Sequence, residues 1–70
     1  MKRIAIKTEF IKLDSFLKLC GEAATGGEAK SLILNGSVKI SGEACYQRGK
    51  KITSGSEIVV NENKYKVIQE

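Results

Sequence analysis

Apolar residues recur along this chain with two different periods, and the change of period separates helices from strands. The first set follows the i, i+3, i+4, i+7 spacing that lines one face of a helix: Leu13, Phe16, Leu17 and Cys20. Gly21 follows directly and is a natural stop, so we predict a helix over residues 13–20. A second set repeats this spacing: Ala29, Leu32, Ile33 and Gly36. Because Asn35-Gly36 is a left-handed C-terminal signal, we predict a second helix over residues 26–35.

The segments outside these helices alternate apolar and polar residues with a period of two, which is typical of strands. We expect a strand at residues 3–7, a segment at 8–12 leading into the first helix, a hairpin of residues 38–40 and 44–45 around Ser41-Gly42, a basic loop at 47–51, a turn at 54–56, and a second hairpin of residues 57–60 and 64–68. Two short helices and about five short strands predict an α+β fold with a small, mostly antiparallel sheet.

The length of the chain limits its organisation. A chain of 70 residues can bury only about 60% of the surface that its unfolded form exposes, so we expect one domain over residues 1–70. No apolar run approaches the ~20 residues that span a bilayer. Lys7 and Glu9 interrupt the N-terminal segment before the core of a signal peptide can form. We therefore expect a cytoplasmic protein, and a monomer.

Positive charge is concentrated in the central third of the chain. The net charge is +4 and the isoelectric point is about 9.2, which is compatible with a polyanionic partner. Residues 30–51 contain five basic residues and one acidic residue, Glu43, so this window holds the excess. The basic residues are Lys30, Lys39, Arg48, Lys50 and Lys51.

Candidate catalytic and metal-binding chemistry is sparse. The chain has no histidine, and its two cysteines, Cys20 and Cys45, do not have the spacing of a CxxC metal site. The carboxylates are not paired at a defined spacing, and neither a cysteine nor a lysine has a neighbouring base in a recognisable motif. We expect no catalytic residue, metal or cofactor. In the cytoplasm a disulfide is disfavoured, so both cysteines are expected to be reduced and at least partly buried.

The stretch TGGEAK, residues 25–30, combines a helix-capping pattern with two glycines. In a capping box the Thr25 hydroxyl accepts from the N–H of Glu28, and the Glu28 carboxylate accepts from the N–H of Thr25. Gly26 and Gly27 then occupy the first turn, where glycine is unfavourable. Two explanations remain open: the glycines expose backbone N–H groups to a phosphate beside the cap, or they permit a close helix approach or a sharp turn.

Basic residues next to this helix start form a candidate anion-binding surface. Lys18 and Lys30 can face outward on the same side of the two helices, and the basic loop can return toward the second helix. Surface lysines are usually only solvated, so the cluster carries more weight than its members.

The order of these elements resembles the S4 RNA-binding domain. The matching segments are LDSFL at residues 13–17, LILNG at 32–36, VKISGE at 38–43, RGKKI at 48–52 and GSEIVV at 55–60, so the resemblance covers a core of about residues 13–60. The segments TEFIKL at 8–13 and GGEAK at 26–30 look like the small stand-alone S4 proteins of the bacterial YaaA/YbcJ type. Many S4 domains have Ser-Arg where this chain has Gly26-Gly27, so part of the usual arginine contact is absent and Lys30 must supply charge nearby.

The resemblance implies an αL motif of two helices and a hairpin that binds structured RNA, commonly ribosomal RNA, in a ribosome or another ribonucleoprotein. The matched positions place these residues at the RNA: Lys18, Thr25, Gly26, Gly27, Lys30, Lys39, Arg48, Lys50 and Lys51. Such a small rigid basic face reads phosphate positions and shape rather than base sequence.

Other functions remain as alternatives. The main one is a protein-interaction module that docks on an acidic partner through the basic face or through a sheet edge at residues 64–68. A DNA-binding role lacks an evident recognition helix, and a sulfur carrier would need a C-terminal Gly-Gly. Tyr46 either packs its ring on the core, which we favour, or stacks on an unpaired base.

Overall fold

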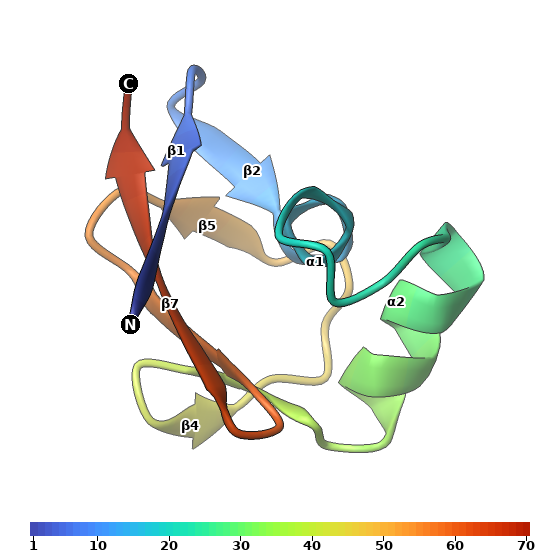
Figure 1. Cartoon of the computed structure of the whole chain (residues 1–70). Helices are drawn as coiled ribbons and strands as arrows, with labels where there is room; N and C mark the ends of the chain where they lie inside the picture. The colour runs from blue at the N-terminus through green and yellow to red at the C-terminus, as the bar shows by residue number, and fades with distance from the viewer.

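Two helices and seven strands make up the computed structural model, which describes residues 1–70 (Figure 1). In chain order they are β1 (Lys2–Ile6), β2 (Phe10–Lys12), α1 (Leu13–Leu19), α2 (Gly26–Leu34), β3 (Val38–Ile40), β4 (Glu43–Ala44), β5 (Lys51–Thr53), β6 (Glu57–Val60) and β7 (Asn63–Gln69). The predicted α+β class and both helices are confirmed, but the predicted strand number was too low. Segments 8–12 and 47–51 were expected to be connections, yet the first contains β2 and the second ends at the start of β5.

Both helices form where apolar spacing predicts them, and each ends one residue earlier than expected. Leu13, Phe16 and Leu17 of α1 are buried, as are Ala29 and Ile33 of α2. Glycines in the left-handed region follow both helices, Gly21 with φ +85° and Gly36 with φ +84°. Because only glycine adopts this conformation without steric penalty, these two residues stop the helices as the sequence indicates.

The main sheet has the strand order β1-β7-β6-β3-β4, and β2 pairs separately with β5. Only the β1–β7 pair is parallel, with Lys2 opposite Tyr65 and Ile6 opposite Gln69, so the sheet is mostly antiparallel as predicted. Both predicted hairpins are present as β3–β4 and β6–β7. Strand β7 lies between β1 and β6, so the idea that residues 64–68 form a sheet edge is wrong.

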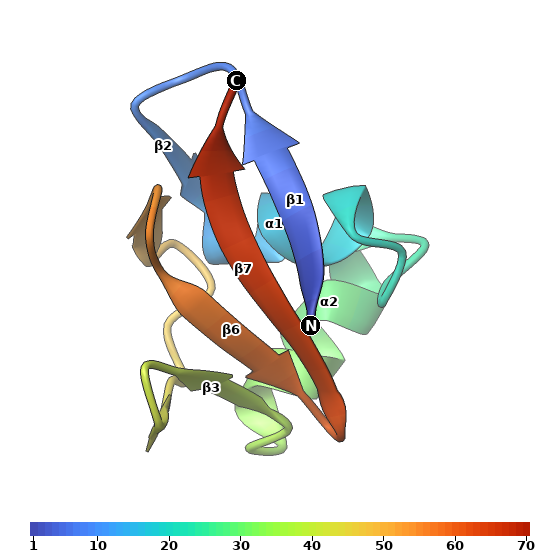
Figure 2. The ribbon, with the colours of Figure 1, turned by 60° about the vertical axis from the view of Figure 1, so that its left-hand side comes forward.

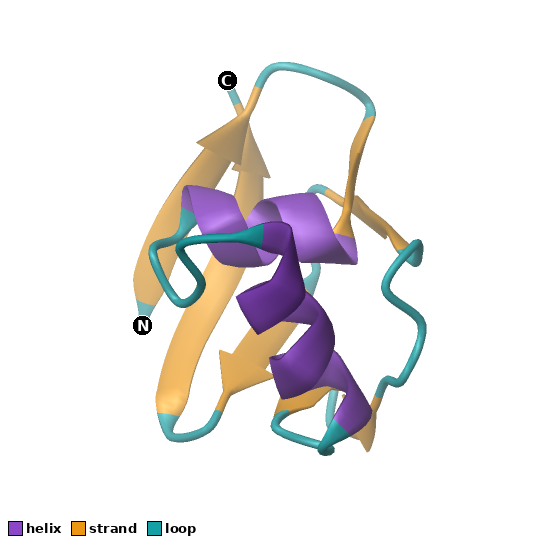
Figure 3. Ribbon diagram, turned by 90° about the vertical axis from the view of Figure 1, so that its right-hand side faces the viewer, coloured by secondary structure: helices purple, strands orange, loops and turns teal.

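The helices cover one face of the main sheet and leave the other face exposed. Figure 3 shows the helix side, and Figure 2 shows the opposite face with α1 and α2 behind it. The core lies between these layers and contains apolar side chains from both helices and from five strands: β1, β3, β5, β6 and β7. Phe16 of α1 is fully buried and meets Tyr65 of β7 edge to face, with ring centroids 6.0 Å apart.

The cysteines lie at the border of this core. Cys20 and Cys45 are half-buried, as predicted, and are not bonded to each other.

Neither helix has the length and apolar content that crossing a membrane requires.

Candidate nucleic-acid interface

Main-chain hydrogen bonds attach the basic loop to the start of α1. The N–H of Leu13 donates to the carbonyl of Lys50 (2.9 Å), and the N–H of Asp14 donates to the carbonyl of Arg48 (3.1 Å). The first N–H groups of a helix have no acceptor within the helix, so the loop carbonyls satisfy two of them. The loop therefore returns to the helices, as the sequence predicts.

The side chain of Arg48 joins the starts of the two helices. Its Nε lies 3.4 Å from Oδ2 of Asp14 in the first turn of α1. Its Nη2 lies 3.8 Å from the point that a Cβ on Gly26 of α2 would occupy. Because half of the Arg48 side chain is exposed, the ion pair contributes only about 0.2–1 kcal/mol to stability. Its main consequence is to hold a guanidinium group between two helix N-termini.

The start of α2 is capped, although not in the full predicted form. Thr25 has an extended backbone, and its hydroxyl accepts from the N–H of Glu28 (3.1 Å), as predicted. The Glu28 carboxylate accepts from the N–H of Ala24 (2.7 Å) and not from that of Thr25, so the second half of the predicted capping box is wrong. The carboxylate therefore satisfies a donor one residue before the cap.

Steric space does not explain the two glycines at the start of α2. A Cβ on Gly26 would meet only the Arg48 guanidinium at 3.8 Å, and a Cβ on Gly27 would meet only the Thr25 hydroxyl at 3.8 Å. Both are ordinary contacts, and neither glycine has a positive φ. The explanation by a close helix approach or a sharp turn is therefore wrong. The N–H groups of Gly26 and Gly27 also lack acceptors within the chain.

Two lysines extend this arrangement along the helices. Lys18 lies four residues after Asp14, and Lys30 lies four residues after Gly26. Residues four apart share one helix face, so both exposed lysines lie on the sides that meet Arg48. We call this surface the helix-side basic face; it contains Lys18, Thr25, Gly26, Gly27, Lys30 and Arg48.

Three other predicted RNA-binding residues, Lys39, Lys50 and Lys51, have different surroundings. Lys51 begins β5, and its Nζ lies 4.8 Å from the centre of the Phe10 ring on β2. Lys39 is exposed between Val38 and Ile40, which turn toward the core, so Lys39 projects from the outer side of the sheet. The same alternation and strand register place three other basic residues on that outer side: Arg3, Lys64 and Lys66.

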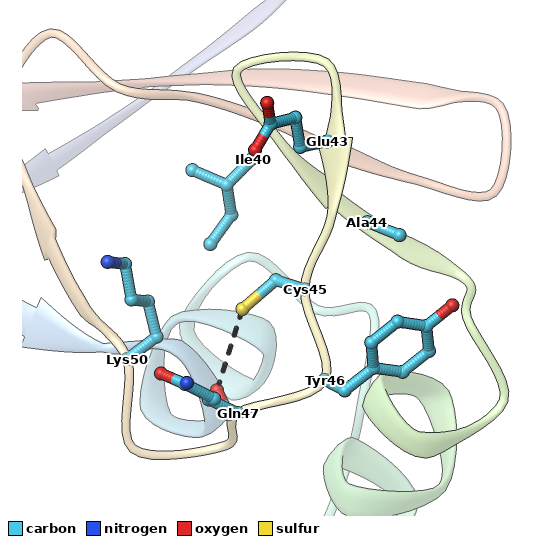
Figure 4. Close-up of a pocket in the computed structure, with 7 residues that line it drawn as sticks. All are labelled: Ile40, Glu43, Ala44, Cys45, Tyr46, Gln47 and Lys50. Atoms are coloured by element: carbon cyan, nitrogen blue, oxygen red, sulfur yellow. Dashed lines mark hydrogen bonds between the residues drawn. The ribbon is translucent and has the colours of Figure 1, made fainter.

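Lys50 lines a pocket of about 470 Å³ between the β3–β4 hairpin and the basic loop (Figure 4). The other lining residues are Ile40, Glu43, Ala44, Cys45, Tyr46 and Gln47. Tyr46 is 59% exposed and its ring lies against Gly36, so the expected packing of this ring on the core is wrong. Its exposure meets the steric requirement for stacking on a base.

Two groups have a shifted pKa, Tyr65 and Cys20. The Tyr65 hydroxyl donates to the Glu22 carboxylate, which raises the pKa of Tyr65, and burial raises it further. Asn63 Nδ2 donates to the same carboxylate oxygen (2.8 Å). Burial also raises the pKa of the Cys20 thiol, which disfavours the nucleophilic thiolate. No group of three His, Cys, Asp or Glu residues is placed to hold a metal ion.

Sequence reasoning missed the partners of two basic side chains. Asp14 and Arg48 are 34 positions apart, and the contact of Lys51 with Phe10 joins two strands that were not predicted. No local pattern indicates either contact, since both depend on the tertiary fold.

Comparison with known proteins places the chain in a family. The family model of the S4 domain matches residues 4–68, almost the whole chain. The chain belongs to the S4 domain family. At the level of the family, the S4 domain is an RNA-binding module. The match extends beyond the expected core of residues 13–60 at both ends, and it includes most of β1 and β7.

A solved structure with the same fold is that of the 30S ribosomal protein S4e from Thermoplasma acidophilum. The two chains superpose with a TM-score of 0.65 at 22% sequence identity, over 86% of this S4 domain and 32% of the S4e chain. At this identity the likeness is one of fold, and this S4 domain spans about a third of the length of that protein. A comparison with curated protein sequences gave no match.

Proposed function

We propose that this S4 domain is a non-catalytic protein that binds structured RNA through the helix-side basic face. The observation that carries the proposal is the position of Arg48, which contacts Asp14 at the start of α1 and approaches Gly26 at the start of α2. The Gly26 and Gly27 N–H groups lack acceptors and lie at the positive end of the α2 dipole, which attracts phosphate. Lys18 and Lys30 add charge on the same side.

Recognition in this proposal depends on RNA shape. Base edges of an RNA duplex lie in a deep, narrow groove, so a short, rigid face contacts phosphates and 2′-hydroxyls. Ribosomal RNA is the first candidate, because the fold is shared with a ribosomal protein. In this proposal the protein acts in the cytoplasm, on the ribosome or on another ribonucleoprotein.

Salt-dependent binding to a folded ribosomal RNA junction tests this proposal. The test variant combines Lys18→Gln, Lys30→Gln and Arg48→Gln. The matched control combines Lys64→Gln, Lys66→Gln and Arg3→Gln on the outer side of the sheet, which removes the same charge. We expect the slope of log K against log salt to become shallower by about 2–3 units in the test variant and to change much less in the control.

Two results contradict the proposal. If both variants change the salt slope equally, RNA binding depends on net charge alone and not on the helix-side basic face. Equal, weak binding to the RNA junction and to duplex DNA, unchanged in the test variant, would favour the alternative of an acidic protein partner. A Lys39→Gln variant tests the predicted contact of Lys39 separately, since Lys39 lies on the outer side of the sheet.

A further inference from the structure

The pocket beside the basic loop combines an apolar floor with polar groups of opposite charge. Ile40 of β3 and Cys45 are half-buried and supply apolar surface. Glu43 and Lys50 are exposed and lie on different sides of the pocket, with Ile40 between them in Figure 4. The Gln47 side chain lies near Lys50 at the rim. The pocket volume of about 470 Å³ is within the ~300–1,000 Å³ range of small-molecule sites.

Neither charged group of this pocket has an ionic partner within the chain. The two ion pairs of the domain are Lys7–Glu70 and Arg48–Asp14, so Glu43 and Lys50 remain available to a ligand. Glu43 is also the one acidic residue within residues 30–51. A carboxylate repels phosphate but accepts hydrogen bonds from amino groups, so the pocket does not suit a phosphate alone.

The pocket and the helix-side basic face share the basic loop. Arg48 belongs to the face, and Lys50 lines the pocket two residues later. The carbonyls of both residues accept hydrogen bonds from the start of α1, so the loop holds the two sites in a fixed relation. Two residues span at most about 7 Å of backbone, so Lys50 at the pocket lies within reach of an RNA strand that contacts Arg48.

We propose that this pocket receives the base of an unpaired nucleotide in the RNA that the helix-side basic face holds by its backbone; this inference rests on the proposed function. The flat face of the base covers Ile40 and Cys45. An amino group on its edge donates to Glu43, and the Lys50 ammonium group contacts the phosphate of the same nucleotide. This fits the general behaviour of RNA-binding proteins, which read unpaired bases by contact with ring faces and hydrogen bonds to base edges.

Binding of three RNA hairpins tests the inference: one fully paired, one with a bulged cytidine, and one with an abasic residue at the bulge. The abasic hairpin keeps the backbone of the bulge and lacks only the base. We expect the wild-type domain to bind the cytidine hairpin at least about fivefold more tightly than the abasic hairpin, as for a base in ordinary contact with a protein. Glu43→Ala lowers this preference, whereas the matched control Glu62→Ala, in the β6–β7 turn, keeps it.

Alkylation of Cys45 provides a second readout that locates the base. In a Cys20→Ser background, saturating cytidine hairpin slows the reaction of Cys45 with N-ethylmaleimide, and saturating abasic hairpin does not. Equal affinity for the cytidine and abasic hairpins overturns the inference and leaves the proposed function intact. If the cytidine hairpin is preferred, but Cys45 is not protected and Glu43→Ala has no effect, the base binds elsewhere and the inference is also overturned. If the wild-type domain binds none of the three hairpins, the proposed function is refuted.

Discussion

Gly27→Ala separates the structural cost of the glycine from its proposed role at a phosphate. Alanine is better than glycine in a helix interior by about 0.8–1 kcal/mol, and about half of this applies in a first turn. The added Cβ would lie 3.8 Å from the Thr25 hydroxyl, so it fits without movement of the cap. We therefore expect the free energy of unfolding to rise by about 0.5 kcal/mol, which raises Tm by roughly 2–4 °C in a domain of this size.

The same substitution is expected to weaken RNA binding. The new methyl group stands beside the Gly27 N–H and keeps a phosphate at a distance. Partial loss of a hydrogen bond to a charged group corresponds to about 1–1.4 kcal/mol, or roughly a five- to tenfold rise in Kd. Thermal denaturation measures the first effect, and titration of a fluorescent RNA junction at fixed salt measures the second.

Ser31→Ala is the matched control for this experiment. Ser31 is exposed in the second turn of α2, so its replacement favours the helix without changing the start. We expect Ser31→Ala to raise Tm and leave Kd unchanged. If Gly27→Ala raises Tm and also leaves Kd unchanged, no phosphate approaches this helix end, and the proposed role of the glycines is wrong.

Three further predictions concern stability. Phe16→Ala lowers the free energy of unfolding by about 3–5 kcal/mol, because a fully buried ring in contact with Tyr65 is lost. Urea denaturation measures this loss, and a value below about 1 kcal/mol would contradict the packing. Folding raises the pKa of Tyr65, so above about pH 10 the unfolded chain loses the phenolic proton while the folded chain keeps it. The free energy of unfolding then falls with rising pH, by up to ~1.4 kcal/mol per pH unit, and in urea titrations the Tyr65→Phe variant does not show this fall. If the wild type and Tyr65→Phe have the same pH profile, the Glu22 contact is refuted. Ser41→Asn raises Tm by a few degrees, because Ser41 has φ +51° in the β3–β4 turn and asparagine tolerates this region better; a lower Tm would show that the serine is needed there.

The elements with strong local patterns could be predicted from the sequence. The buried face of α1 follows directly from the spacing of Leu13, Phe16 and Leu17, and Gly21 marks its end. Strands β2 and β5 were missed because each has three residues and pairs only with the other, about forty positions away. No local period encodes that pairing, and the same holds for the parallel β1–β7 pair.

The candidate site could be predicted in its residue types but only partly in its geometry. Arg48 and the capped start of α2 follow from composition and from the TGGE pattern, and the structure brings them together. The alternation of Val38, Lys39 and Ile40 puts Lys39 on the side opposite the core, whereas the family resemblance alone placed it at the RNA together with the helix residues. The pocket beside Lys50 needs the β3–β4 hairpin and the loop to meet in space, so a linear sequence gives no sign of it.

The parallel pairing of β1 with β7 has a consequence for synthesis on the ribosome. Strand β1 is made first and has no partner except β7, which begins about sixty residues later. At ~5–20 residues per second, β1 waits roughly 3–12 s for its only hydrogen-bonding neighbour. During this time it is an unpaired strand, and such strands attract other chains. The charges of Lys2 and Arg3 within β1, and of Lys7 directly after it, oppose that association, so they protect the nascent chain before the sheet is complete.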